Sequence, residues 1–443
     1  MLPSTIYASY AAVCPSDQFA HGGKSAVFFR RNIALVAFVG LAVLGLGSSA
    51  VAGFSRNPAL GSGRSGSLND VSADSPTDAW AVGTYPNPTT GASETLVLRW
   101  NGTGWSKVAS PNPGGTKKLC GLCIENSLSS VSAHSAIDAW AVGSYENPTT
   151  QAAETLVLHW NGSSWSQVAS PNPGGTTSSS SGNGLSGVSA NSATDVWAVG
   201  FYSNQTTGAT QTLVVHWNGT SWSKVASPNP AGSTSSSDFN IPSGVSAQSA
   251  SNVWAVGAYD NPTTNANQTL VLHWNGTRWS MVASPSPGAT GNPYGACFLE
   301  RVSAESPTDA WAVGCYPNPT TNAFETLVLH WNGTRWSQVA SPTPGGNDFL
   351  TGLNGVSARS ATDAWAVGNY SNQTTGATET LVLHWNGTRW SQVASPNPGG
   401  TTTSSSNGLK GVSAHSATDV WAVGSYTGGT LVLHWNGTNW SNA

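Results

Sequence analysis

Four charged residues stand directly before a repeated tripeptide, Val-Ser-Ala, and they are the first candidates for chemistry. In most copies the two residues before the tripeptide are Ser, Gly or Asn, and charge enters only at Asp70, Glu300, Arg301 and Lys410. Two carboxylates facing each other across a cleft can act as acid and base in glycoside hydrolysis. Groups of both signs can also bind a polar ligand without any reaction, and polar residues are common at any wet channel mouth.

Repeated histidines and aspartates form a second set of chemical groups. Six histidines share one position of the repeat, where the first copy has Arg99: His159, His216, His273, His330, His384 and His434. Zinc ligands lie at about 2.0–2.3 Å from the metal, and histidines from different copies cannot converge to that distance, so we predict no metal site. The repeated aspartates, such as Asp78 and Asp138, are expected to accept backbone hydrogen bonds in a turn.

Motifs that mark well-known catalytic and cofactor sites are missing. The sequence has no GxSxG, no HExxH, no phosphate-binding loop and no EF-hand pattern, and we predict no catalytic residue and no cofactor. Its 16 Lys and Arg are spread along the chain without a cluster and the net charge is −4, so no basic stripe is available for nucleic acid.

Five cysteines include one pair placed symmetrically in a predicted hairpin. Cys297 and Cys315 are equidistant from its centre near Ser306, which predicts a cross-strand disulfide worth about 3 kcal/mol. Cys120 and Cys123 lie in a connecting loop, where a local disulfide is favoured over redox chemistry or half a zinc site.

The elements that must position these residues follow from seven internal repeats. Val-Ser-Ala begins at positions 71, 131, 188, 245, 302, 356 and 412, and three tryptophans per repeat account for all 21. Each repeat has four short segments rich in Val, Leu, Trp and Thr, separated by turn residues. A four-stranded meander cannot bury both faces alone, so the repeats predict an all-β, seven-bladed β-propeller of four-stranded antiparallel blades.

Asn-Gly between the third and fourth segments predicts a two-residue hairpin turn. In the first repeat that turn pairs Trp100 with Thr103 and sets Leu98 opposite Trp105. The predicted blades span residues 67–113, 127–173, 184–230, 241–287, 298–344, 352–398 and 408–442. Because the last segment is short, residues 54–58 are a candidate to complete the seventh blade.

The repeated Asp-Ala/Val-Trp-Ala-Val-Gly, as in Asp78–Gly83 and Asp195–Gly200, resembles secreted bacterial β-propellers built from DAWAVG-type repeats. More distantly the body resembles Kelch and Asp-box propellers. It lacks the paired glycines of Kelch repeats and the Ser-to-Asp spacing of the Asp-box, so the resemblance implies the fold and little about function.

The N-terminus resembles a secretion signal. Ile33–Leu46 is an apolar run of 14 residues, preceded by Arg30 and Arg31 and followed by Ala50-Val51-Ala52. We predict a leader over residues 1–52, an exported propeller over 53–443, and membrane attachment only if the leader is not cleaved. Oligomeric state is left open.

Three functions remain open for such a propeller. The favoured one is a secreted or surface-displayed, non-catalytic binding module for a glycan or protein on the rim with the longer loops. Its multivalent form uses the Asn-Pro/Gln-Thr-Thr loops, as at Asn87–Thr90, although these residues are also simply good turn formers. The alternatives are a glycoside hydrolase or lyase at the channel mouth and a structural envelope or matrix protein.

Overall fold

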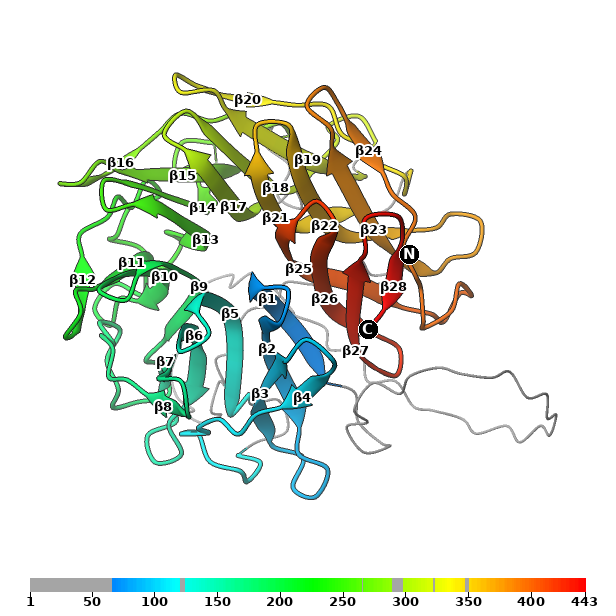
Figure 1. Ribbon diagram of the computed structural model, residues 1–443. Helices are drawn as coiled ribbons and strands as arrows, with labels where there is room; N and C mark the ends of the chain where they lie inside the picture. Colours follow the sequence, from blue (N-terminus) through cyan, green and yellow to red (C-terminus); the bar gives the residue numbers. More distant parts are fainter. Residues whose placement is uncertain (1–65, 120–123, 265, 289–297, 322, 347–349) are drawn as a thin grey trace, which may run out of the picture.

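The computed structural model describes residues 66–443, except 120–123, 265, 289–297, 322 and 347–349. These residues form 28 strands in seven four-stranded antiparallel sheets, set as blades around an axis (Figure 1). The predicted seven-bladed propeller is thereby confirmed. The predicted leader lies outside the described residues, and within them no helix is long and apolar enough to cross a bilayer.

Each blade takes its four strands in chain order, from the axis outward. The innermost strands are β1 (Ser67–Ser75), β5 (Asn126–Ser135), β9 (Asn183–Ser192), β13 (Asn240–Ser249), β17 (Phe298–Ser306), β21 (Gly352–Ser360) and β25 (Asn407–Ser416). The second strands are β2 (Asp78–Pro86), β6 (Asp138–Glu146), β10 (Asp195–Ser203), β14 (Asn252–Asp260), β18 (Asp309–Pro317), β22 (Asp363–Ser371) and β26 (Asp419–Tyr426).

The outer half of each blade repeats in the same way. The third strands are β3 (Ser93–Trp100), β7 (Ala153–Trp160), β11 (Thr210–Trp217), β15 (Asn267–Trp274), β19 (Phe324–Trp331), β23 (Thr378–Trp385) and β27 (Gly429–Trp435). The outermost strands are β4 (Trp105–Lys107), β8 (Trp165–Gln167), β12 (Trp222–Val225), β16 (Trp279–Met281), β20 (Trp336–Gln338), β24 (Trp390–Gln392) and β28 (Trp440–Asn442). Blades one to seven are numbered in this order.

A closed ring of hydrogen bonds joins the innermost strands and explains the repeated Val-Ser-Ala. In every blade the Ala amide donates to the Ser hydroxyl of the preceding blade, and Ala73 of blade one donates to Ser413 of blade seven at 3.0 Å. The other six bonds measure 2.9–3.0 Å. The junction between the last and first blades is therefore made like the other six.

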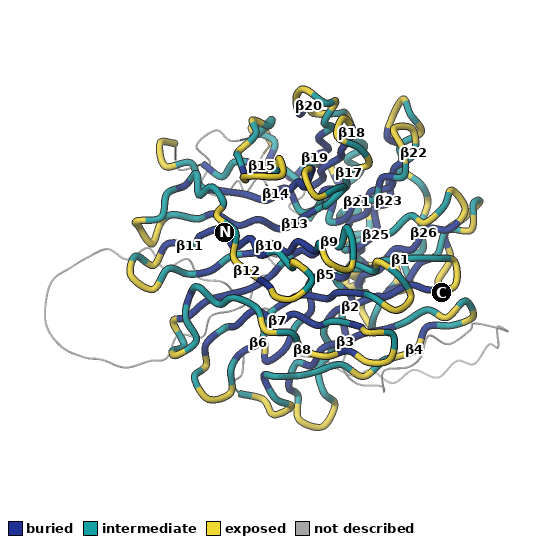
Figure 2. The backbone as a smooth tube through the Cα atoms, turned by 60° about the vertical axis from the view of Figure 1, so that its left-hand side comes forward, coloured by how far each residue is buried: buried dark blue, intermediate teal, exposed yellow. Residues whose placement is uncertain are grey.

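Tryptophan fills the space between neighbouring blades. Trp80 of blade one is fully buried, and its ring lies 4.9 Å from Trp160 and 5.1 Å from Trp165 of blade two. Trp421 of blade seven meets Trp100 and Trp105 of blade one at 4.9 and 5.1 Å. Buried strands and exposed turns alternate throughout the molecule (Figure 2). All 21 tryptophans thus belong to the interblade core or its edge, where each buries a large apolar area.

The glycine that ends the DAWAVG motif has a steric cause. A Cβ atom on Gly83 would lie 1.9 Å from the carbonyl oxygen of Ser67. The pairing of β1 with β2 shifts between Leu68 and Asp70, so a bulge brings the two backbones together at this point. Only glycine fits such an approach.

The Asn-Gly turn differs from the two-residue prediction. Trp100 pairs with Trp105 rather than Thr103, and Leu98 pairs with Lys107 rather than Trp105. Gly102 has φ of 90°, and the Asn101 side-chain oxygen accepts hydrogen bonds from the amides of Thr103 and Gly104, both at 3.0 Å. The Asn side chain closes a four-residue loop. The observed register differs from the predicted one by two residues. Because side chains alternate between the two faces of a sheet, a difference of two keeps the large apolar residues on the predicted face.

Blade seven has four strands of its own. Its outermost strand, β28, pairs with β27 and is as long as β4 or β8. The Ala443 amide donates to the Val432 carbonyl at 3.1 Å, as Val108 does to Val97 in blade one. The proposal that residues 54–58 supply a missing outer strand is therefore not needed; those residues lie outside the described part.

Candidate functional site

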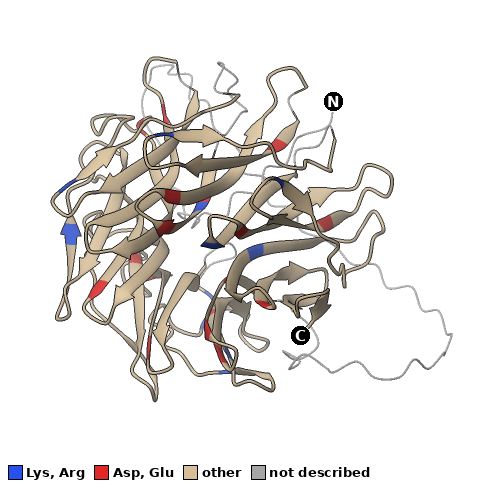
Figure 3. Ribbon diagram, turned by 45° about the horizontal axis from the view of Figure 1, so that its top comes forward, with Lys and Arg blue, Asp and Glu red and all other residues tan. Residues whose placement is uncertain are grey.

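The two residues before each Val-Ser-Ala, in the first half of each innermost strand, form two successive layers toward one mouth of the central channel. The outer layer contains Asn69, Ser129, Ser186, Ser243, Glu300, Asn354 and Lys410. The inner layer contains Asp70, Ser130, Gly187, Gly244, Arg301, Gly355 and Gly411. The strands begin at the rim of the longer loops, so this is the mouth on that rim. Charged residues are sparse in the molecule, and both signs occur on the innermost strands (Figure 3).

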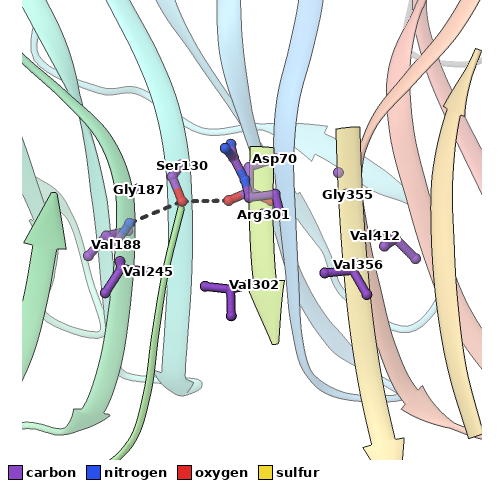
Figure 4. Close-up of a pocket in the computed structure, with 11 residues that line it drawn as sticks. Asp70, Ser130, Gly187, Val188, Val245, Arg301, Val302, Gly355, Val356 and Val412 are labelled. Atoms are coloured by element: carbon purple, nitrogen blue, oxygen red, sulfur yellow. Dashed lines mark hydrogen bonds between the residues drawn. The ribbon is translucent and has the colours of Figure 1, made fainter. Parts of the chain in front are cut away.

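A cavity of about 110 Å³ lies beneath the inner layer. Asp70, Ser130 and Arg301 supply its polar wall, while glycines and the valines of the Val-Ser-Ala motif line the remainder (Figure 4). Ligand pockets for molecules of drug size enclose about 300–1,000 Å³. A liquid water occupies about 30 Å³, so this cavity holds a few waters or a small ion and is too small for a sugar ring.

Close packing of the strands explains why glycine is frequent in the inner layer. A Cβ on Gly411 would lie 2.7 Å from Cα of Asp70, and one on Gly244 would lie 2.8 Å from the Glu300 carbonyl oxygen. Neighbouring strands leave no room for side chains at these blades. The larger groups of Asp70 and Arg301 are therefore exceptions to the packing of this layer.

Asp70 is held by three donors of its own and the next blade. Its carboxylate accepts hydrogen bonds from the Ser130 hydroxyl at 2.6 Å, the Val131 amide at 3.1 Å and the Val71 amide at 3.0 Å. Burial raises the pKa of Asp70, while the charge of Arg301 and these hydrogen bonds oppose the rise. Ser130, which the sequence did not single out, is the residue that fixes this carboxylate.

Arg301 reaches across the channel. Its guanidinium donates to the carbonyls of Ser243 at 3.2 Å and Glu300 at 3.1 Å, and to the carbonyl of Ser129 in blade two at 3.3 Å. Its Nε is buried without a hydrogen-bond partner. Arg301 thus bridges blade five to blade two at the level of the outer layer, and it also lines the small cavity.

Glu300 and Lys410 complete the charged group in the outer layer. Lys410 Nζ donates to Asn69 Oδ1 at 2.9 Å. Within the described residues, the Glu300 carboxylate makes no hydrogen bond. Burial raises the pKa of Glu300, against the opposing charges of Arg301 and Lys410. Burial lowers the pKa of Lys410, and the Arg301 charge lowers it further.

All four charged residues predicted at the channel mouth are therefore brought together. Arg301 acts electrostatically on each of the other three, and Glu300 acts on Lys410. The group has two cations and two anions, which come from blades one, five and seven. It offers hydrogen-bond donors and acceptors in a mouth that is otherwise lined by Ser, Asn and Gly.

The repeated histidines have a local structural role. His159 stacks on Trp140 of its own blade at 4.2 Å, and its Nε2 lies 2.7 Å from Asp138 Oδ1. The other histidines repeat this pairing, with Asn252 as the partner of His273, and Arg99 pairs with Asp78 in blade one. The prediction that these aspartates accept backbone hydrogen bonds in the turn is wrong. Oδ1 of Asp138 instead pairs with His159 of the third strand, and Oδ1 of Asp78 pairs with Arg99. Among the described residues, no three His, Cys, Asp or Glu are grouped as metal ligands.

The Asn-Pro/Gln-Thr-Thr loops use their polar groups internally. Asn87 accepts hydrogen bonds from the amides of Thr89 and Thr90 and donates to Glu94 at 2.6 Å. Tyr85 also donates to Glu94. The same turn recurs at Asn204 and at Asn318. These contacts favour the interpretation of the loops as turns over their interpretation as equivalent binding sites.

The disulfide predictions involve Cys297, Cys120 and Cys123, which lie outside the described residues. In the hairpin of blade five, the register sets Phe298, not Cys297, opposite Cys315. The hairpin turns between Ser306 and Asp309, later in the chain than the centre near Ser306 that the sequence predicted, and after two register shifts along the strands the partner of Cys315 is Phe298. Both disulfides stay predictions.

Comparison with known proteins supports the fold and no more specific class. No family model and no curated protein matches the chain. A GH74 xyloglucanase from Xanthomonas campestris is similar in structure, with a TM-score of 0.52 and 14% identity over 87% of this chain. The chain spans about half of that enzyme, 54% of its length. A polysaccharide lyase of family PL25, an ulvan lyase, has a TM-score of 0.52 and 9% identity, covering 86% of this chain and 96% of the lyase.

A fucose-specific lectin from Aleuria aurantia is more distant. Its TM-score is 0.41, at 12% identity over 73% of this chain and 94% of the lectin. The propeller fold is thus shared with the xyloglucanase and the ulvan lyase. At these identities the likeness does not choose between binding and catalysis.

Proposed function

We propose that this protein is an exported, non-catalytic binding module with one principal site, the channel mouth formed by Asn69, Glu300, Arg301 and Lys410. The observation that carries the proposal is the convergence of charge there. Seven nearly identical blades differ in charge at this level only in blades one, five and seven, and those residues act on one another across the mouth.

The ligand that fits this chemistry best is a neutral, hydroxyl-rich carbohydrate. The four charged residues at and below the mouth, Asp70, Glu300, Arg301 and Lys410, have no net formal charge, which disfavours a polyanionic ligand. Hydroxyl groups both donate and accept, so they can satisfy Lys410 and Glu300 together. The small cavity below Arg301 cannot admit a sugar ring, so the ligand would lie above Arg301. Export is supported by the leader-like N-terminal sequence.

A glycan-binding experiment with matched variants tests this proposal. Glu300→Gln/Lys410→Met alters the mouth, and Thr149→Ala alters an exposed loop residue of blade two as a control. We expect neutral glycans to bind the wild type and the control equally, and to bind the mouth variant at least about tenfold more weakly, because two charge-assisted hydrogen bonds are lost. Unchanged binding by the mouth variant would move the site to the rim loops, and the absence of binding would leave a protein ligand or a structural role.

A second candidate function, glycan hydrolysis or elimination, rests on Glu300. The half-buried Glu300 carboxyl has a pKa raised by burial and makes no hydrogen bond among the described residues, so it is a suitable proton donor. Release of new reducing ends from a bound glycan would support it. Turnover lost in Glu300→Gln while binding persists would establish catalysis, and intact glycan after long incubation with the wild type would exclude it for that glycan.

A further inference from the structure

Two asparagines occupy the same place in the outer layer at the channel mouth. Asn69 lies in blade one and Asn354 in blade six, at a position where blades two to four have serine. Asn69 Nδ2 donates to the Leu128 carbonyl of blade two, and Asn354 Nδ2 donates to the Leu409 carbonyl of blade seven, both at 2.7 Å. Each asparagine is therefore held by the next blade in the ring.

This contact fixes which end of the Asn354 side chain is the acceptor. A carbonyl oxygen can only accept, so the atom that faces the Leu409 carbonyl must be the amide nitrogen. The same nitrogen donates to Asn369 Oδ1 at 3.3 Å, and Asn369 in turn donates to the Leu350 carbonyl. The amide of Asn354 therefore has one orientation, in which Oδ1 is left as a hydrogen-bond acceptor.

The two asparagines differ in what their oxygen receives. Asn69 Oδ1 accepts a hydrogen bond at 2.9 Å from Lys410, which is the outer-layer residue of the preceding blade, blade seven. For Asn354 the preceding blade is blade five, and its outer-layer residue is Glu300. A carboxylate has no hydrogen to donate. Within the described residues, Asn354 Oδ1 accepts no hydrogen bond, so blades five and six have two acceptors where blades seven and one have a donor and an acceptor.

Both of these acceptors are accessible from the mouth. Glu300 and Asn354 are half-buried, so a ligand can reach them. The guanidinium of Arg301 does not satisfy them, because it donates to the backbone carbonyls of Ser129, Ser243 and Glu300. The side of the mouth over blades two to four thus has serines, two of them bonded to Arg301 through their carbonyls, while the side over blades five and six has acceptors that lack a donor.

We infer that Asn354 is a further ligand-binding residue of the channel mouth, and that its Oδ1 and the Glu300 carboxylate accept the hydrogens of two adjacent hydroxyl groups on one sugar ring. The inference rests on the proposed glycan-binding function and adds the feature that the mouth selects, a vicinal diol. A single hydroxyl has one hydrogen and cannot satisfy both acceptors, whereas neighbouring hydroxyls supply one each. Lys410, from the next blade, can donate to an oxygen of the same sugar. The ligand is therefore bound over blades five to seven, to one side of the channel axis.

Saturation-transfer NMR with the methyl glycosides of D-glucose, D-mannose, D-galactose and D-xylose tests the inference. Asn354→Ser introduces the residue that blades two to four have at this position, so we expect the fold to tolerate it. It should weaken binding of the glycoside that the wild type prefers by about fivefold, because one hydrogen bond to the ligand is lost. Ser186→Ala, in the outer layer of blade three, is the matched control and leaves the affinity unchanged.

Monodeoxy analogues of the preferred glycoside distinguish a contact with the ligand from a structural role of Asn354. Removal of either of the two adjacent hydroxyls should weaken binding to the wild type by about fivefold or more. In Asn354→Ser, removal of the hydroxyl that donates to Asn354 should have no further effect, because its partner is already absent. Thermal unfolding of each variant is measured in parallel, so that weaker binding is not attributed to unfolding.

The possible failures of this inference and of the proposed function are separable. Unchanged affinity in Asn354→Ser, together with binding lost in Glu300→Gln/Lys410→Met, would overturn the inference and leave the proposed function intact. Binding that depends on one hydroxyl only, or on two that are not adjacent, would overturn the diol. Absence of wild-type binding to all four glycosides would also overturn it, and the glycan-binding experiment with the mouth variant then decides whether the proposed function stands.

Discussion

The serines of the seven Val-Ser-Ala tripeptides lie on the same strands as the residues directly before and after each tripeptide, yet the two sets have different roles. The serines are identical in all blades and form one closed hydrogen-bonded ring. The flanking positions carry almost all the charge on these strands and form no regular ring. Residues that are identical in all seven blades hold the ring together. Residues that differ between blades carry the charged groups that are available to bind a ligand or to react.

The largest expected effect comes from the symmetric core. Trp254 is 1% exposed and lies 4.9 Å from Trp331 of the next blade. Trp254→Ala should lower the free energy of unfolding by about 3–5 kcal/mol, because it removes a large buried ring and leaves a cavity. Urea unfolding measures the change. Glu300→Gln, at the divergent mouth, is the contrast and should change stability little; an equal loss in both variants would remove the distinction between the two regions.

Arg301 lies at the divergent mouth and also contributes to the stability of the fold. Arg301→Met removes the cation beside buried Asp70 and frees three backbone carbonyls, so we expect a loss of about 1–3 kcal/mol. The double variant Arg301→Met/Asp70→Asn should recover part of this loss, since the remaining side chain is neutral. Chemical denaturation of the four proteins completes the cycle, and additive losses would mean that the two residues are not coupled.

The serine ring is expected to contribute a smaller amount per blade. Ser246→Ala leaves the Ala304 amide without its 3.0 Å partner and should cost about 1–2 kcal/mol. Because the ring is repeated, Ser132→Ala, which removes the bond to Ala190, should cost the same in urea unfolding. A clear difference between the two would show that the junctions are not equivalent.

The smallest expected effect is a pH dependence of stability that arises from His273 in blade four. Burial lowers the pKa of His273, whose partner is Asn252 rather than an aspartate. The unfolded chain then binds the proton more readily, so stability is full above the unfolded pKa and declines as pH falls below about 6.5. Asn252→Asp should raise the pKa of His273 and recover about 0.5 kcal/mol at pH 5, after allowance for solvent screening. Thermal unfolding at pH 5 and pH 8 gives the difference.

Blade three provides the reverse change as a control. Asp195→Asn creates the Asn–His pair of blade four and should make the protein less stable at pH 5 than at pH 8, relative to the wild type. If both substitutions shift stability in the same direction, the partner of the histidine is not the cause.

Repetition made the blades predictable, because seven copies of the same strand pattern leave one plausible assembly. The four mouth residues were predictable for the same reason, since a charge such as Arg301 is conspicuous where the other copies have small residues. The contacts of the Arg301 side chain were not predictable, because they depend on how closely the neighbouring strands approach each other, and the repeat pattern does not contain that information. Likewise, two of the three donors that fix Asp70, Ser130 and Val131, come from the next blade, 60 and 61 residues along the chain.

Local turn chemistry caused the remaining errors. Asn101 and Gly102 were predicted to form a two-residue turn, whereas the Asn101 side chain accepts backbone hydrogen bonds and the loop has four residues. The turn of blade five likewise lies later than predicted, between Ser306 and Asp309, so that Phe298 is the residue opposite Cys315. A one-residue insertion within a strand has no composition signal, so register is the level at which sequence patterns fail here.

Because the seven junctions between blades are made in the same way, the number of blades in such a ring can change. Each blade draws its four strands from one continuous segment, and the junction of blade seven with blade one uses the same serine and tryptophan contacts as the others. Duplicating or deleting one unit of sequence therefore adds or removes a whole blade without splitting a sheet between the ends of the chain. A gene encoding this ring can grow by unequal recombination, and its new copy is free to diverge at the mouths.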